Sequence, residues 1–549
     1  MTNTLVEVDG AKTSVPPPTT PRRRRARRWL LPIVVVLLLA EMAFAMVSTA
    51  VAQSPTTDEP VYVGTAVVYL QQHSLRYNAE HPPLGKLIMD AGLWFAHPRL
   101  DPAFHGDEWA LGNQLLFDSG NDPARLMLLA RLPIILLTLL FGLVAFAFAR
   151  DLAGNAGGVV ALALYAFDPD LIAHGSLATL DVSAAGFLLT TAWLLWRARR
   201  RPLRYLPLAG VALGAAMATR MSVLPVVPVL LALAALSWWH ARREVWRGIA
   251  AAAGVGVIAI AVVWVTYLAV DPHLRYTAVD VPTIHGIRGL VTDLMPVPEP
   301  YRDGMRIQFG FEDSRFGGFL FGRQYDGSLW YYLPAALLVK TPLGAMVLWA
   351  LGAATMLSVR RLRAGAPYVL VPAAVLFAAA LSGTRDFGTR YAIFLPMFLA
   401  VAAATVVTVR PRWTRIATAA LVLYVAVSSV RTYPYYLPYS NEAFGGPAKT
   451  WLRLHDSNSD WGQDLARVAT WLSAHDAGQQ VWVVYKGGGD PAYYLPGYGY
   501  PLGIPPDRVH GLLVVSNDAI DKADPELRAL LAGSRPVEQV GHSITIFRR

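Results

Sequence analysis

The sequence contains no cysteine, which excludes disulfide bonds, thiol nucleophiles and metal sites with cysteine ligands. Charged residues are also few, at 16% of the 549 residues, whereas 54% are hydrophobic. This composition excludes a water-soluble globular protein and is typical of a chain that folds in a lipid bilayer. The formal charge of +10 does not indicate nucleic-acid binding, because the basic residues lie in short clusters between long apolar runs.

Residues 1–28 are polar and end in a run of arginines. They predict a disordered basic tail on the cytoplasmic side of the membrane. The apolar run that follows can cross about 30 Å of hydrocarbon, and it is longer than the apolar region of a cleaved signal peptide. With it, the sequence predicts about eleven membrane-spanning helices, at residues 29–52, 126–149, 154–172, 176–196, 205–219, 222–239, 248–270, 335–357, 366–382, 391–409 and 416–431.

Basic clusters follow alternate predicted spans, so all of them fall on the side of the N-terminus, as the positive-inside rule requires. A transmembrane domain at 29–431 is therefore expected, with outer loops at 53–125 and 271–328. Residues 432–549 would then lie outside the cytoplasm. Apolar runs at 481–485, 512–515 and 544–547 predict strands of a small α/β domain there.

Three carboxylates are candidates for chemistry. Asp58 and Glu59 lie a few residues after the first span, at the outer interface where a lipid phosphate would lie. Because neighbouring side chains project in different directions, one of the two is expected to act alone. A solvated acidic pair is the structural alternative. Asp181 is predicted about two turns inside the span that begins near Ser176, where an ionisable group needs a partner or a function.

Several cations lie on the same outer side. Lys86 follows a turn that Pro82 and Pro83 make rigid, so it is expected at the membrane surface, where snorkelling is the alternative explanation. Four more cations lie near outer span ends, against the positive-inside bias: Arg220, Lys340, Arg385 and Arg390. A bound phosphate would explain them; pairing with Asp181, Asp386 or Glu442 is the competing account.

The segment 456–464 has the acidic spacing of a calcium loop, but Trp461 and Arg467 stand where an EF-hand needs Gly and Glu. A capped turn that leads into an amphipathic helix at 465–472 is predicted instead.

With these residues, the chain resembles the superfamily of protein O-mannosyltransferases and aminoarabinose transferases, which are lipid-carrier-dependent glycosyltransferases of the GT-C fold. The resemblance rests on motifs in the same order: Asp58-Glu59-Pro60, His81 to Lys86, Ala178 to Asp181, Lys340-Thr341-Pro342, Arg390-Tyr391 and Asp456 to Leu465. No β-trefoil repeat like that of eukaryotic protein mannosyltransferases is recognised in the sequence.

The resemblance implies an α-helical polytopic membrane enzyme with a small extracytoplasmic C-terminal α/β domain. It would transfer a sugar, mannose or pentose-like, from polyprenyl phosphate with inversion. Asp58 would be the general base, and Glu59 and Asp181 would join it in the catalytic set. The donor phosphate would be bound by Lys86, Arg220, Lys340 and Arg390, and the substrate-binding loop would comprise Glu80, His81, Pro82 and Pro83.

The acceptor stays open between Ser or Thr of a protein and a glycan or lipid of the cell envelope. No metal is required, although a divalent metal stays open, since Glu80 and His81 alone are too few ligands for zinc. A polytopic transporter or translocase of lipid-linked sugars is the alternative. It is disfavoured because no repeated halves are recognised and the charges lie at the outer interface.

Overall fold

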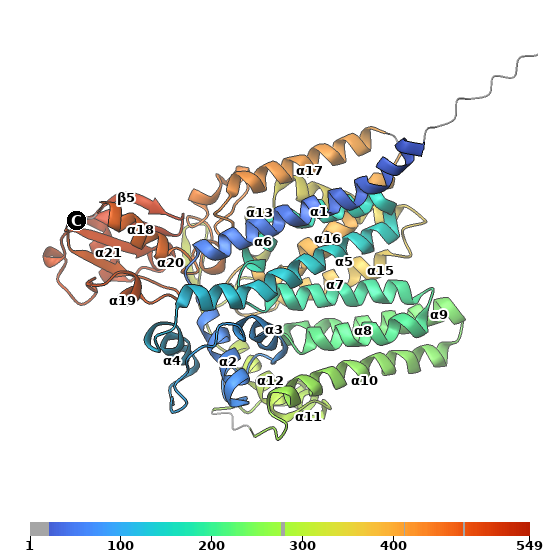
Figure 1. The fold of residues 1–549 in the computed structure, drawn as a ribbon, viewed down its shortest axis with the longest axis horizontal. Helices are drawn as coiled ribbons and strands as arrows, with labels where there is room; N and C mark the ends of the chain where they lie inside the picture. The colour runs from blue at the N-terminus through green and yellow to red at the C-terminus, as the bar shows by residue number, and fades with distance from the viewer. Residues whose placement is uncertain (1–20, 276–279, 411, 476–477) are drawn as a thin grey trace, which may run out of the picture.

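Helices make up most of the computed structural model, which describes residues 21–275, 280–410, 412–475 and 478–549. The long helices lie side by side as a bundle (Figure 1). They are α1 (Pro21–Ala52), α5 (Pro123–Ala166), α7 (Asp181–Ala198), α8 (Pro202–Met217), α9 (Val227–Arg242), α10 (Val245–Val270), α14 (Leu343–Ser358), α15 (Ala366–Leu381), α16 (Phe394–Ala403) and α17 (Trp413–Thr432).

Five helices among the described residues are long and apolar enough to cross a membrane, or six if the bent pair α13 (Tyr332–Lys340) and α14 is one span. Each of the predicted spans nevertheless falls mainly on helix. The predicted break before residue 154 lies inside the 44-residue α5, where Gly154 has a φ of 76° and kinks the helix. The predicted span 335–357 is bent by 116° where Pro342 separates α13 from α14.

Two predictions about helix starts are wrong. Helix α1 begins at Pro21, so residues 21–28 are helical rather than disordered; residues 1–20 of the predicted tail lie outside the described residues. Helix α7 begins at Asp181, so this carboxylate lies in the first turn of the helix and not two turns inside it. The preceding residues Ser176 to Leu180 form an irregular connection from the short α6 (Pro169–Gly175).

The predicted outer segments gather at one end of the bundle, opposite the start of α1 (Figure 1). Residues 53–125 hold α2 (Glu59–Gln72), α3 (Leu84–Leu93), α4 (Glu108–Asn113) and the π-helical turn η1 (Gln114–Asp118). Residues 271–328 hold α11 (Gly286–Leu294), α12 (Glu299–Glu312) and a hairpin of β1 (Gly317–Leu320) and β2 (Arg323–Asp326). The described residues also form short 3₁₀ helices: η2 (Met221–Val226), η3 (Thr389–Ala392), η4 (Ala404–Thr408), η5 (Glu442–Phe444), η6 (Pro447–Lys449), η7 (Asp456–Asn458) and η8 (Pro506–Arg508).

The C-terminal region contains the expected small α/β fold at the same end (Figure 1). Its mixed sheet has the order β3-β4-β6-β5, in which only β3 and β4 are parallel. The elements are α18 (Leu465–His475), β3 (Val481–Val484), α19 (Pro491–Tyr494), β4 (Leu512–Ser516), α20 (Asn517–Asp521), α21 (Pro525–Ala532), β5 (Arg535–Val540) and β6 (Ile544–Arg548).

Strand β4 is buried on both faces, which explains its continuous apolar run. Leu512 and Val514 pack in one cluster with Leu465 of α18, while Leu513 and Val515 pack in another with residues of α21. The predicted strands and the predicted helix at 465–472 are therefore confirmed.

Candidate active site

The segment 456–464 lies against the loop that carries Asp58. The backbone amide of Ser54 donates to the carbonyl of Gln463 at 3.0 Å, and that of Thr57 donates to the carbonyl of Trp461 at 2.9 Å. These bonds join positions about 400 residues apart in sequence. They place Asp58, the residue before α2, beside Trp461.

Asp58 forms an ion pair with Arg390, whose Nη1 lies 2.5 Å from Oδ2 of Asp58. The guanidinium also lies over the ring of Trp461, 4.3 Å from its centre. The Asp58 side chain caps no backbone amide of α2 and is 22% exposed, so it is both held in place and accessible.

Glu59 has a different environment, although it follows Asp58 directly. Its carboxylate is fully buried and paired with Arg131 of α5, with Nε–Oε1 and Nη2–Oε2 distances of 2.8 and 2.6 Å. The backbone amides of Thr56 and Ala178 and the Thr56 hydroxyl also donate to it. Burial by itself would raise the pKa of Glu59, but Arg131 and the backbone amides outweigh burial and lower it. The solvated-pair alternative is therefore excluded for Glu59.

Asp181 pairs with Arg220, which precedes η2. The guanidinium of Arg220 lies over the ring of Tyr391, 5.5 Å from its centre, and that of Arg390 lies 5.2 Å from the same centre. The structure thus brings the pairs Asp181–Arg220 and Asp58–Arg390 together around one tyrosine, a contact that sequence spacing could not establish. The sequence left two explanations for Arg220, a bound phosphate or pairing with a carboxylate such as Asp181. The pairing with Asp181 is present in the structure.

Lys86 is buried inside the turn that the two prolines begin. Its Nζ donates to the carbonyl and side-chain oxygens of Asn78, at 3.0 and 2.9 Å, and to the carbonyl of His81, at 2.8 Å. Three acceptors match the three N–H groups of an ammonium ion. Burial lowers the pKa of Lys86 to about 7. Lys86 therefore holds the turn together, and the structure does not place it at the membrane surface.

The turn that contains Lys86 also carries the predicted substrate-binding loop. Pro82 and Pro83 are buried, the Glu80 side chain accepts from Asn78 at 2.6 Å, and the ring of His81 packs edge-on against Tyr62. Burial, followed by the charge of Arg220, lowers the pKa of His81 well below its usual value, so this imidazole is neutral.

Lys340 is buried at the end of α13. Its Nζ donates to the carbonyls of Leu437 and Asn458, at 2.6 and 3.0 Å, and lies 3.1 Å from Oδ1 of Asp170. The other oxygen of Asp170 accepts from the hydroxyl of Thr389, the neighbour of Arg390. Lys340 and Asp170 thus support the turn η3 that presents Arg390.

Sequence reasoning missed Asp170, Thr389 and Asn458 as members of this site. Asn458 accepts from the backbone amide of Thr389 at 3.0 Å through its side-chain oxygen. Its position within the polar segment 456–464 could have identified Asn458 as a candidate site residue. Asp170 had a signal too, because a carboxylate next to an apolar run needs a partner.

The comparison with family models decides the class of protein. Residues 34–279 match the family described as dolichyl-phosphate-mannose-protein mannosyltransferase. The match covers 246 of the 549 residues, which is less than half of the chain. The chain is accordingly a multi-pass membrane glycosyltransferase that uses a polyprenyl-phosphate sugar.

Solved structures similar to the chain include ArnT from Cupriavidus metallidurans in the apo state, at 15% identity over 95% of this chain and 98% of ArnT, with a TM-score of 0.48. ArnT bound to undecaprenyl phosphate gives 14% identity, 93% and 97% coverage, and a TM-score of 0.47. The protein O-mannosyltransferase complex of S. cerevisiae bound to the sugar donor gives 16% identity, 44% and 33% coverage, and a TM-score of 0.34. No curated protein matches the sequence significantly.

The family match covers only part of the candidate site of this glycosyltransferase. Asp58, Lys86, Asp181 and Arg220 lie within residues 34–279, whereas Arg390 lies beyond them.

A group of potential metal ligands lies behind the site. Ligand atoms of His455, Asp456 and Asp518 lie within 4.8 Å of one another, and none of these residues belongs to the predicted Glu80–His81 pair. The ammonium of Lys486 lies 3.4 Å from Asp456 and pairs more closely with Asp518. Lys522 lies 3.6 Å from Asp518 as well, so two lysines balance the two carboxylate charges that would attract a metal.

Proposed function

We propose that this glycosyltransferase has a GT-C fold of about eleven spans and transfers a mannose or pentose-like sugar on the extracytoplasmic side. Its N-terminus would be cytoplasmic and its C-terminal domain extracytoplasmic. The acceptor would be a hydroxyl group of a protein, or of a glycan or lipid of the cell envelope. One observation supports the proposal most strongly: the accessible carboxylate of Asp58 pairs with Arg390, and Arg390 and Arg220 both lie over the ring of Tyr391.

The proposed reaction is a single inverting displacement. Asp58 removes the proton from the acceptor hydroxyl while its oxygen bonds to the anomeric carbon, and the bond from that carbon to the phosphate oxygen breaks. The phosphate leaves with its electron pair, and Arg220 and Arg390 stabilise the added negative charge. Donor phosphate would compete with Asp58 for Arg390, so donor binding would free the carboxylate to act as a base.

The remaining predicted residues take supporting roles in this proposal. Glu59 positions the Asp58 loop through Arg131, and Asp181 orients Arg220. The roles of Lys86 and Lys340 in donor binding are indirect, because the turns that they hold carry the site.

The test measures release of polyprenyl phosphate from polyprenyl-phosphate mannose or pentose by the purified chain, with a membrane extract as acceptor. Asp58→Asn should lower the turnover by a factor of about 10²–10⁴, the usual contribution of a general base. Asp118→Asn is the matched control, because Asp118 is an exposed carboxylate of the same outer segment. Equal turnover by wild type and Asp58→Asn would exclude Asp58 as the base.

A further inference from the structure

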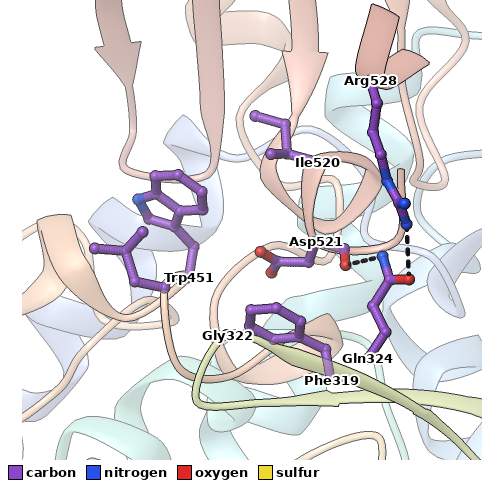
Figure 2. Close-up of a pocket in the computed structure, with 8 residues that line it drawn as sticks. Phe319, Gly322, Gln324, Trp451, Ile520, Asp521 and Arg528 are labelled. Carbon is purple, nitrogen blue, oxygen red and sulfur yellow. Dashed lines mark hydrogen bonds between the residues drawn. The ribbon is translucent and has the colours of Figure 1, made fainter. Parts of the chain in front are cut away.

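A cavity of about 470 Å³ lies between the β1–β2 hairpin and the C-terminal α/β region, separate from the residues around Asp58. Phe319 and Gln324 line it from the hairpin, Trp451 lines it from the loop before η7, and Asp521 and Arg528 line it from α20 and α21 (Figure 2). Its volume falls within the range of about 300–1,000 Å³ that is usual for small-molecule sites.

Hydrogen bonds join the two walls of the cavity to each other. The side-chain amide of Gln324 donates to the backbone carbonyl of Asp521 at 2.6 Å and accepts from Arg528 at 3.1 Å (Figure 2). The backbone amide of Phe321 also donates to the carbonyl of Arg453 at 2.8 Å. The hairpin is thus fastened to the C-terminal region, so the cavity exists before any ligand enters.

The lining combines aromatic rings with an unsatisfied carboxyl group. Phe319 and Trp451 contribute the rings, and Figure 2 shows the carboxyl of Asp521 pointing toward the side that Trp451 lines. Oδ2 of Asp521 is buried and has no hydrogen-bond partner among the described residues. A water or a ligand group can supply the hydrogen bond that such a buried polar atom lacks.

The protonation state of Asp521 suits a neutral ligand. Burial and the carboxylates of Asp518 and Asp460 raise the pKa of Asp521 to about 9, against the opposing charge of Lys522. At neutral pH this carboxyl therefore carries a proton and can both donate and accept a hydrogen bond. A sugar ring has C–H faces that can pack on aromatic rings and hydroxyl groups that can bond to such a carboxyl. A purely apolar ligand would leave the carboxyl unsatisfied.

From this lining we infer that the cavity binds a sugar residue of a glycan acceptor. The inference rests on the proposed function, since it narrows the acceptor from the classes left open above to a saccharide. In this arrangement the cavity holds one part of the acceptor, while another sugar residue of the same glycan presents its hydroxyl to Asp58.

Hydrogen bonds connect the cavity to the part of the site that contains Asp58 and Arg390. Asp521 ends α20, and Asp518 of the same helix accepts from the backbone amide of Asp456 at 2.8 Å. Asn458, two residues after Asp456, accepts through its side-chain oxygen from the backbone amide of Thr389, which precedes Arg390. The cavity is therefore connected to the segment 456–464, which also supports Arg390, the partner of Asp58.

The test measures equilibrium binding of labelled mannotriose, arabinotriose and a Ser/Thr-rich peptide to the full chain in nanodiscs. We expect a trisaccharide to bind and Trp451→Ala to weaken binding on the order of tenfold, as loss of a central aromatic contact does. Trp330→Ala is the matched control, because Trp330 is exposed and does not line the cavity. Release of polyprenyl phosphate without added acceptor should be the same in Trp451→Ala as in wild type.

Oxidative footprinting provides a second measurement that needs no variant, since a bound trisaccharide should protect Trp451 from hydroxyl radicals. Binding of the peptide alone, binding of neither trisaccharide, or unchanged affinity in Trp451→Ala would each overturn the inference. A failure of the proposed function is distinguishable from these outcomes, because it would appear as equal donor turnover by wild type and Asp58→Asn.

Discussion

Removal of either partner of the buried Glu59–Arg131 pair should destabilise the fold much more than removal of an exposed pair. All five N–H groups of Arg131 have acceptors: two go to Glu59, and the rest go to the carbonyls of Ala50, Gln53 and Ser54. Both side chains are almost completely buried. Arg131→Met therefore leaves a buried carboxylate without its counter-charge and three carbonyls without their donors.

Breaking a buried ion pair from one side costs about 3–5 kcal/mol of unfolding free energy. The matched control is Arg197→Met, which breaks the pair with Asp151, whose side chains are 28% and 19% exposed. Partial exposure lets water replace the lost contacts, so we expect that loss to be about 1 kcal/mol or less. The double variant Glu59→Gln with Arg131→Met should recover about 2 kcal/mol relative to the sum of the single losses, because the two groups are directly coupled.

The assay is reversible unfolding of the purified chain in mixed detergent micelles, followed by circular dichroism. All variants are measured at the same micelle composition, so that differences in unfolding free energy are comparable. If Arg131→Met costs no more than Arg197→Met, or if the double variant shows no coupling, the Glu59–Arg131 pair does not hold the Asp58 loop in place.

Three further outcomes are expected. Lys86→Met should lower the unfolding free energy by about 3 kcal/mol, because three hydrogen bonds to an ammonium are lost; a raised KM for the donor with unchanged stability would instead indicate direct phosphate binding. Gly112→Ala should destabilise by about 1–3 kcal/mol, since a Cβ there would lie 2.5 Å from the backbone of Pro60, whereas Gly254→Ala, with open space around it, should not in the same unfolding assay. The stability that wild type has over Glu59→Gln should be present above about pH 4.5 and be lost as the pH falls below it, because the folded pKa of Glu59 is depressed; a pH titration of unfolding that shows a constant difference would contradict this.

Much of the architecture could be predicted from the sequence because apolar runs and turn residues act locally. The break at Gly154 and the strands β3, β4 and β6 follow from such patterns. Strand β5 (Arg535–Val540) was missed because it has no continuous apolar run, contains a proline and lies largely exposed at the sheet edge. The start of α7 at Asp181 was misplaced because the residues before it are apolar but not helical.

The candidate site was predicted as a set of residues but not as an arrangement. Charged residues near span ends stand out in any apolar sequence, so Asp58, Arg220 and Arg390 could be selected without a structure. The same signal selected Lys86 and Lys340, and it could not distinguish a lysine that faces a ligand from one whose three N–H groups are used inside the protein.

The sequence by itself determined that the chain is suited to span a membrane and that its charges favour one side, because these properties depend on composition and local order. Its short motifs resemble those of glycosyltransferases that use a lipid-linked sugar, and this resemblance also needs no tertiary structure. Only the tertiary structure decided that Asp58 is accessible while Glu59 is buried, although the two are neighbours. The physical reason is that burial and charge pairing depend on partners far away in the chain, Arg390 for one carboxylate and Arg131 for the other, and folding alone brings them within hydrogen-bond distance.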